Sequence, residues 1–228
     1  DSSDTSSPTK QVPAKPAATV PEPLPLSKEE LADGWIRLFD GSTLFGWQAS
    51  SDADWQVVDG AITVSRGTKG LLCTTTPFSN YMLSLEFRSA EGTNSGIFLH
   101  TPFKPQDPAN DCYELNIADA DNPFPTGSLV KRQKTVGNFD SPGWQRYEVT
   151  VLFDTITVVL DGQQILEYRD PQPLRRGRLG LQLNEGQVAF RDIKLKPLKL
   201  DPLFNGKDLQ GWKTYPDMAS KFTVSDEG

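Results

Sequence analysis

Histidine and cysteine are scarce in this chain of 228 residues, which has one histidine, His100, and two cysteines, Cys73 and Cys112. A Ser-His-Asp or Cys-His catalytic system needs a histidine beside its nucleophile, and no G-x-S-x-G turn surrounds a serine, so serine-hydrolase chemistry is disfavoured. A structural zinc site needs more ligands of these types than the chain has. Both cysteines lie in apolar strand-like segments, where free buried cysteines are common, although pairing in an exported protein stays open.

Positive charge is also in short supply, because 23 Lys and Arg face 30 Asp and Glu and the net charge is −7. Nucleic-acid binding requires clustered basic residues, so it is excluded as a main function. The one basic run, Lys131 to Lys134, is short. A solvated loop is the preferred interpretation of it, and a ligand contact is the alternative. No apolar run approaches the roughly 20 residues of a membrane span, and no glycine-rich loop resembles a phosphate cradle.

Large apolar side chains are nearly absent from residues 1–32, which are rich in Pro, Ser, Thr and Ala. Such a segment cannot bury enough surface to offset chain entropy, so we predict a disordered linker that acts as a tether for the rest of the chain. The only helical signal is a short turn at 27–31. The chain does not begin with Met and carries such a tether. Both features favour export, so we expect a periplasmic, secreted or cell-surface protein.

Alternating apolar and polar residues fill the segment 33–198. Y-M-L-S-L-E-F from Tyr81 shows the period of two that is typical of a half-buried strand, and similar runs begin at Tyr147, Ile156 and Leu179. Turn sequences such as Asp-Gly at 59–60 and 161–162 separate these runs. We therefore predict one all-β domain of antiparallel strands, either a sandwich or a barrel.

A repeat marks the end of this domain. L-F-D-G-S-T-L-F-G-W at 38–47 returns as L-F-N-G-K-D-L-Q-G-W at 203–212. A match of this length predicts that residues 199–228 are the truncated start of a second copy of the domain.

The segment C-Y-E-L-N-I-A-D at 112–119 carries the clearest polar signal. In a strand, Tyr113, Leu115 and Ile117 share the core face, whereas Glu114 and Asn116 share the other. Further polar residues occur in comparable strand or turn contexts, each with an ordinary structural interpretation of its own: Asn94, Ser95, His100, Ser128, Lys131 and Gln182. Together, a carboxylate, amides and hydroxyls suit a sugar, whose hydroxyls both donate and accept hydrogen bonds.

The usual glycosidase mechanism fits this set poorly. It requires two carboxylates flanking the scissile bond, and no second acid shares the face of Glu114 on its strand. Glu86 lies on another strand, but beside Arg88 it is equally well explained as a surface ion pair.

Several of these motifs occur in the same order in a known family. W-I-R-L-F-D-G-S-T-L-F-G-W, W-Q-V-V-D-G, N-S-G-I-F-L-H, C-Y-E-L-N-I and G-R-L-G-L-Q-L resemble the 3-keto-disaccharide hydrolase domain over residues 34–198. The resemblance implies a concanavalin A-like jelly-roll β-sandwich with a sugar site on its concave sheet. It also implies cleavage of a 3-keto-glycoside by elimination followed by hydration, for which one well-placed base is enough.

The resemblance also implies roles for individual residues. Glu114 matches the family's strand glutamate, a base or metal ligand, and His100 is its expected catalytic partner. Asn116 stands where the pattern commonly has Gln, His100 where it has Arg, and Leu183 where it often has His. The remaining expected substrate contacts are Asn94, Ser95, Ser128, Lys131 and Gln182, and the only cofactor considered is a divalent metal ion. The alternative function is a non-catalytic carbohydrate-binding or adhesion module on the same fold.

Overall fold

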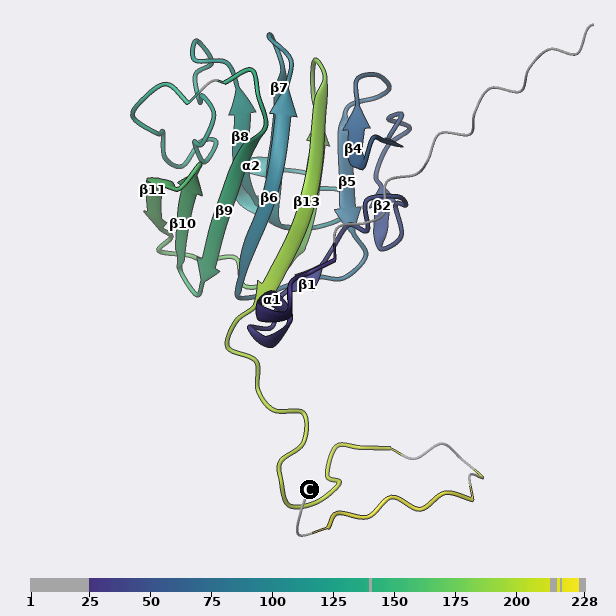
Figure 1. Ribbon diagram of the computed structural model, residues 1–228. Coiled ribbons are helices and arrows are strands. Elements are labelled where there is room, and N and C mark those ends of the chain that lie inside the picture. The colour runs from purple at the N-terminus through teal and green to yellow at the C-terminus, as the bar shows by residue number, and fades with distance from the viewer. Residues whose placement is uncertain (1–24, 140, 214–216, 218, 226–228) are drawn as a thin grey trace, which may run out of the picture.

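Two antiparallel sheets packed face to face make up the computed structural model, which describes residues 25–139, 141–213, 217 and 219–225 (Figure 1). The eight-stranded sheet has the order β11-β10-β9-β6-β13-β4-β3, with β1 paired to β13, and the five-stranded sheet has the order β2-β5-β12-β7-β8. The prediction of an all-β sandwich is confirmed. Among the described residues, no helix is long and apolar enough to cross a membrane.

The elements have the following bounds. In the eight-stranded sheet they are β1 (Ile36–Arg37), β3 (Gln56–Val58), β4 (Ala61–Val64), β6 (Tyr81–Ser89), β9 (Gln145–Leu152), β10 (Thr155–Leu160), β11 (Gln163–Arg169) and β13 (Val188–Pro197). In the five-stranded sheet they are β2 (Trp47–Ala49), β5 (Gly70–Thr74), β7 (Asn94–Thr101), β8 (Tyr113–Ala118) and β12 (Arg178–Leu183), and the short helices are α1 (Lys28–Ala32) and α2 (Pro108–Asp111).

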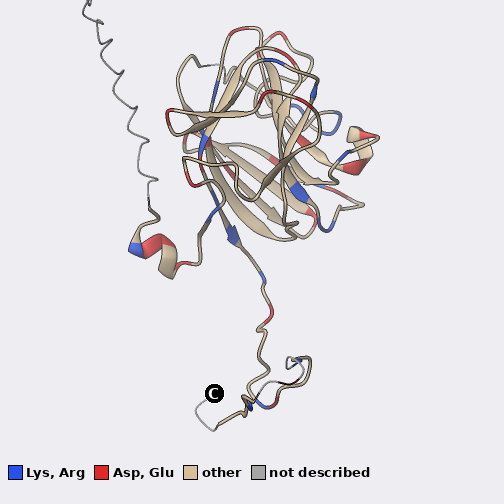
Figure 2. Cartoon of the chain, turned by 90° about the vertical axis from the view of Figure 1, so that its right-hand side faces the viewer, with Lys and Arg blue, Asp and Glu red and all other residues tan. Residues whose placement is uncertain are grey.

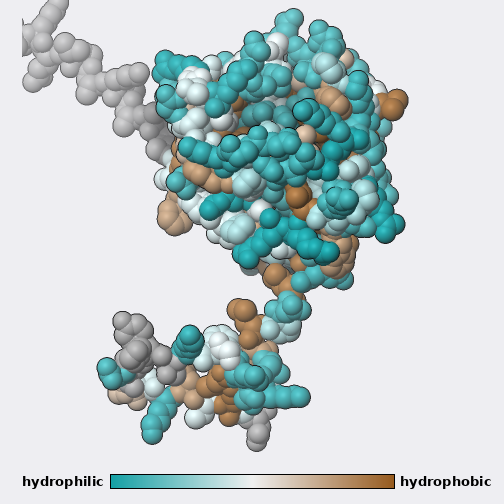
Figure 3. Space-filling model, turned by 180° about the vertical axis from the view of Figure 1, so that it is seen from behind, coloured by the Kyte–Doolittle hydropathy of each residue, from teal (hydrophilic) through white to brown (hydrophobic). Residues whose placement is uncertain are grey.

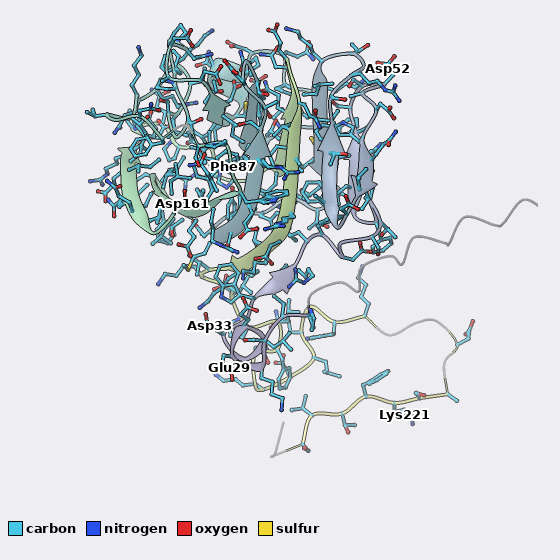
Figure 4. All side chains as sticks on the ribbon, turned by 45° about the horizontal axis from the view of Figure 1, so that its top comes forward. Glu29, Asp33, Asp52, Phe87, Asp161 and Lys221 are labelled. Atoms are coloured by element: carbon cyan, nitrogen blue, oxygen red, sulfur yellow. The ribbon has the colours of Figure 1, made fainter. Side chains whose placement is uncertain are left out.

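The core lies between the sheets and follows the period of two. The inward residues of β6, β8 and β9 are almost fully buried, as illustrated by Phe87, which lies between the layers in Figure 4 and stacks on Tyr147 at 4.7 Å between ring centroids. Each large apolar side chain buried in this way contributes about 1.5–3 kcal/mol. Tyr113, Leu115 and Ile117 belong to this core, as the alternation in β8 predicts.

The Asp-Gly turns form where the sequence places them. Asp59 and Gly60 join β3 to β4 with φ of 51° and 75°, and Asp161 and Gly162 join β10 to β11 with 49° and 81°. Two successive residues in the left-handed region match the right-handed twist of the paired strands, and Gly at the second position adopts it without strain.

Part of the segment predicted as linker is ordered. Residues 1–24 lie outside the described part, but the expected turn at 27–31 is α1, where Ser27 and Glu30 form a reciprocal capping box. Lys194 of β13 contacts Glu30 at 2.5 Å, and Lys196 contacts Asp33 at 2.5 Å. A Ser cap with an acidic third residue begins a helix even in a segment of low hydrophobicity, and these ion pairs attach it to the sandwich.

The C-terminal segment leaves the sandwich after β13 (Figures 1 and 2). The repeat keeps its local turn: Trp47 donates its backbone N–H to Leu44 O at 3.0 Å, and Trp212 donates to Leu209 O at 3.0 Å. Trp47 is buried, whereas Trp212 is 53% exposed. The described residues beyond 198 contain no strand, so the predicted second copy gains no support beyond this turn.

Candidate functional site on the five-stranded sheet

Glu114, Asn116 and Gln182 lie together on the outer face of the five-stranded sheet. In the pairing of β7 with β8, Gly96 faces Asn116 and Phe98 faces Glu114. On the other side of β7, Leu181 pairs with Ile97, so Gln182 follows beside Gly96. Because alternate strand residues share a face, the register brings one carboxylate and two amides onto a single patch.

Gly96 provides the space in which Glu114 and Gln182 meet. A Cβ atom at this position would lie 3.3 Å from Glu114 Cγ, 3.5 Å from Gln182 Oε1 and 3.0 Å from the backbone oxygen of Leu115. Glycine in a strand interior commonly marks a close approach of other groups. The N-S-G sequence at 94–96 is typical of a turn, but in the structure it begins β7, and Gly96 is the residue that allows the close approach.

The environment of Glu114 raises the pKa of its carboxyl above the ordinary value, chiefly because the group is withdrawn from water. A hydrogen bond from Gln182 and the positive charge of Lys131 act in the opposite direction and leave a smaller net rise. A carboxylate of raised pKa is a stronger base, which is what proton abstraction requires.

Two amide oxygens on this patch lack partners. Asn116 is 2% exposed and donates its Nδ2 to Phe124 O, while its Oδ1 and the Oε1 of Gln182 are buried without a hydrogen bond. An unsatisfied buried acceptor costs about 1–3 kcal/mol. A buried acceptor without a partner in a folded protein calls for an explanation, and a ligand that supplies the missing donor is one.

Lys131 reaches this patch from a tight turn. It is exposed with a φ of 61°, directly before Arg132, whose guanidinium bonds Asp170 at 2.9 Å and lies 4.4 Å from the centre of the Tyr113 ring. Arg132 also donates to the backbone oxygens of residues 109 and 112. The interpretation of 131–134 as a solvated loop is therefore wrong for Arg132, because a buried carboxylate and an aromatic face accept its side chain.

Asn94 lies on the same face of β7 as Gly96, two residues toward the end of the sheet. Its backbone bridges to Glu185, and its side chain is half-buried. The structure thus places Asn94 at the rim of the patch.

His100 does not meet Glu114. A register shift next to β12 and a φ of 53° turn its ring inward, where it lies 5.6 Å from the Tyr81 ring centre. Its two nitrogens face the backbone oxygens of Leu174 and Ser79 at 2.8 and 2.7 Å. Simple alternation put His100 on the outer face, and the irregularity reverses it, so the predicted catalytic pairing is not supported.

Ser95 and Ser128 are also engaged elsewhere. Ser95 is fully buried and donates to the backbone oxygen of Gln182 at 2.7 Å, whereas the Ser128 hydroxyl lies 3.1 Å from that of Thr135. The Ser95 hydroxyl links β7 to β12, and the Ser128 hydroxyl links two parts of the loop between β8 and β9, so both are already engaged.

The alternative second acid lies on the other sheet. Glu86 points outward from β6 and pairs with Arg146 at 2.8 Å and Arg191 at 2.6 Å, not with Arg88 as expected. A two-carboxylate site with Glu114 is therefore incompatible with the fold, because the core separates the two side chains.

A cleft of about 650 Å³ continues from Gln182 across the same face. Leu71 and Phe98 form its floor, and the loop that follows β7 contributes Pro105 and Pro108. No motif in the sequence indicated this cleft, because its walls come from loops far apart in the chain.

The oxygen donors around Glu114 are too few for a divalent ion. Beside the one carboxylate are the uncharged oxygens of Asn116 and Gln182, so most of the roughly 6–8 oxygen ligands of Ca²⁺ or six of Mg²⁺ would have to be water, and a single carboxylate offsets only half of the ion's charge. Among the described residues, no group of three or more His, Cys, Asp or Glu is arranged to hold a metal ion. This donor set does not fit the expected ion, and the chemistry proposed below uses none.

Comparison with known proteins agrees with this architecture. The sequence pattern of the 3-keto-alpha-glucoside-1,2-lyase-like domain family matches residues 34–196. The chain belongs to this family. A 3-keto-disaccharide hydrolase from Bacteroides thetaiotaomicron is 34% identical over 232 aligned positions, covering 73% of this chain and 79% of that protein.

Two solved structures show the same fold. A glycosyl hydrolase candidate from Parabacteroides distasonis superposes with a TM-score of 0.68 at 21% identity, covering 76% of this chain and 98% of that one. The carbohydrate-binding module CBM66 from Bacillus subtilis gives 0.54 at 12% identity, covering 66% and 95%. The expected concanavalin A-like jelly roll is thereby confirmed, and membership of the family supports a carbohydrate-active function.

Proposed function

We propose that this domain cleaves 3-keto-glycosides, with Glu114 as the base. The observation that carries the proposal is the Glu114–Gln182 contact over Gly96: a carboxyl of raised pKa is held beside two unpartnered amide oxygens on one sheet face. The relative described as a 3-keto-disaccharide hydrolase supports the same substrate class.

The chemistry requires only one carboxylate. A ketone at C3 acidifies the C2 proton; Glu114 takes that proton, and the electrons of the C2–H bond form an enolate that Lys131 stabilises with its charge. The enolate then expels the glycosidic oxygen by breaking the C1–O bond, and the leaving oxygen receives the proton from Glu114. Water adds across the resulting C1=C2 bond, so the net products are a 3-keto sugar and the free alcohol.

Asn116 and Gln182 hold the sugar in this scheme. Both oxygens are buried in this structure, so the two side chains must rotate toward the sugar before they accept hydrogen bonds from its hydroxyls. The Gln182 amide nitrogen keeps Glu114 in place. Asn94 at the rim is a further contact for a sugar hydroxyl.

The test is to incubate the chain with a 3-keto-glucoside and with the same glucoside before oxidation, and to follow release of the alcohol. We expect release from the 3-keto compound only. No release from either compound, with or without added divalent metal, would overturn the enzymatic proposal.

A non-catalytic carbohydrate-binding module is the second candidate. It is favoured by one observation: among the described residues, Lys131 is the one charged side chain that acts on Glu114, so there is no second carboxyl group at this site to share the catalysis. This alternative predicts sugar binding that survives Glu114→Gln together with no turnover by the unmodified chain.

A further inference from the structure

We propose that the cleft beside Gln182 is the subsite for the leaving group of the substrate, and that it favours an aromatic group bearing a carboxylate. The proposal rests on the function proposed for Glu114, because it assigns the sugar to that patch and the attached group to the cleft.

The cleft and the patch share Gln182. This residue contacts Glu114 over Gly96 and also lines the cleft, whose floor continues onto Leu71 of the next strand. Neighbouring strands lie about 4.8 Å apart. Phe98 is on the strand next to Glu114 and Leu71 is three strands away, so a group attached to a sugar at Glu114 reaches Phe98 first and extends toward Leu71.

The floor of the cleft is apolar, whereas Gln182, Lys69 and Lys104 line its sides. Leu71 and Phe98 are 4% and 2% exposed, and Pro105 and Pro108 face the same space. The serine hydroxyls of the opposite wall are already engaged: Ser51 donates to Thr68 O at 2.9 Å, and Ser50 accepts from the Leu71 N–H at 2.9 Å. A second sugar needs polar partners for its hydroxyls, whereas an aromatic ring needs apolar contact, so the ring fits better.

Two lysines lie on opposite sides of the cleft. Lys69 comes from the turn before β5 and Lys104 from the loop after β7, both are exposed, and neither has an ion-pair partner within the described chain. The one acid that lines the cleft is Asp52, and hydrogen bonds from the side chain and then the backbone N–H of Thr68 lower its pKa and keep it ionised. Figure 4 shows Asp52 at the edge of the sandwich. Two cations against one anion favour a carboxylate on the bound ring.

The outer surface of the five-stranded sheet also combines small apolar areas with polar surroundings. Seen from behind in Figure 3, the side of the five-stranded sheet is largely hydrophilic, with small hydrophobic areas between the polar side chains. A small apolar floor with a charged rim selects a small amphiphilic group and not an extended apolar one.

The experiment measures binding of free leaving groups, because turnover also depends on how readily each group departs. The binding of 4-hydroxybenzoate, phenol and glucose to the full chain is compared by backbone amide NMR titration. We expect 4-hydroxybenzoate to bind most tightly, with the largest shifts at Leu71, Phe98 and Lys104. Lys69→Gln and Lys104→Gln should each weaken it about threefold, the range expected for one exposed charge, and leave phenol unchanged. Lys28→Gln on α1 is the matched control and should change nothing.

Preference for glucose, shifts confined to other faces, or lysine variants without effect would overturn the subsite. The outcome is separable from that of the proposed function. Turnover of a phenyl 3-keto-glucoside without binding of 4-hydroxybenzoate removes the subsite alone, and binding without turnover removes the reaction assigned to Glu114.

Discussion

The outer faces of the two sheets differ in how their charged side chains are paired. On the eight-stranded sheet, Arg146 bonds both Glu86 and Asp192, and Arg191 bonds Glu86, so that these four charges form one network. On the five-stranded sheet, Glu114 has no ion pair within hydrogen-bond reach in the described chain, and two amide oxygens nearby have no partner. Paired charges stabilise a surface, whereas unsatisfied groups cost stability and persist where a ligand uses them. The difference supports the proposal that the five-stranded face is the functional one.

The largest effect is expected from Glu114→Gln. Removing the base should lower turnover of a 3-keto-glucoside by about 10²–10⁴-fold, the usual contribution of a general base. Stability should not fall: the folded-state pKa of Glu114 is raised, so the native chain holds the proton more tightly than the unfolded chain, and stability is lost as pH rises through that pKa. Thermal unfolding at neutral pH should therefore show the variant to be at least as stable as the unmodified chain. A large loss of stability would contradict the assignment of Glu114 as a catalytic group of raised pKa, because it would show that the carboxylate stabilises the fold.

Gly96→Ala should separate the site from ordinary packing. The added methyl group crowds Glu114 and Gln182, and we expect at least a tenfold loss in kcat/KM, about 1.4 kcal/mol. Gly180→Ala is the matched control when the substrate is a methyl 3-keto-glucoside, whose leaving group is too small to fill the cleft. Its Cβ would lie 3.3 Å from Leu71 Cδ1 and Phe98 Cβ without touching Glu114. If both variants lose activity equally, crowding of the sheet and not the Glu114–Gln182 contact is responsible.

Glu86→Gln tests the paired face. It leaves Arg146 and Arg191 with a weaker acceptor, so the free energy of unfolding should fall by about 1 kcal/mol. Denaturant titration measures the loss, and turnover should be unchanged. A drop in activity comparable to that of Glu114→Gln would place the chemistry on the eight-stranded sheet and contradict the site proposed around Glu114.

Lys131→Gln should lower turnover, because the enolate loses the positive charge that stabilises it. The smallest effect in this series is the shift that the same variant causes in the pH dependence. Turnover requires ionised Glu114, so kcat/KM should rise as pH increases through a pKa above the usual value for Glu. Lys131 lowers that pKa, so its loss should move the rise to higher pH, by a small amount because the lysine is exposed. Lys28→Gln should leave the profile in place. A shift to lower pH would contradict the assignment of the rise to Glu114.

Local patterns in the sequence predicted the strands, the Asp-Gly turns and the faces of β8, because each depends on residues close together in the chain. The same reasoning failed for His100, since a β-bulge moves every later side chain to the opposite face and left no mark in the alternation. It failed for Arg132 because the burial of this side chain depends on Asp170, which lies 38 residues away.

The candidate site likewise has features that local sequence predicts and features that depend on contacts between distant segments. The sequence by itself determined that Glu114 and Asn116 share a face opposite to the core, because the period of a strand is two. Only the tertiary structure decided that Gln182 meets Glu114 over Gly96, that Ser95, Ser128 and His100 are turned away, and that a cleft continues from Gln182. Strand order and register are set by pairing between distant segments, and no local pattern encodes which strands become neighbours.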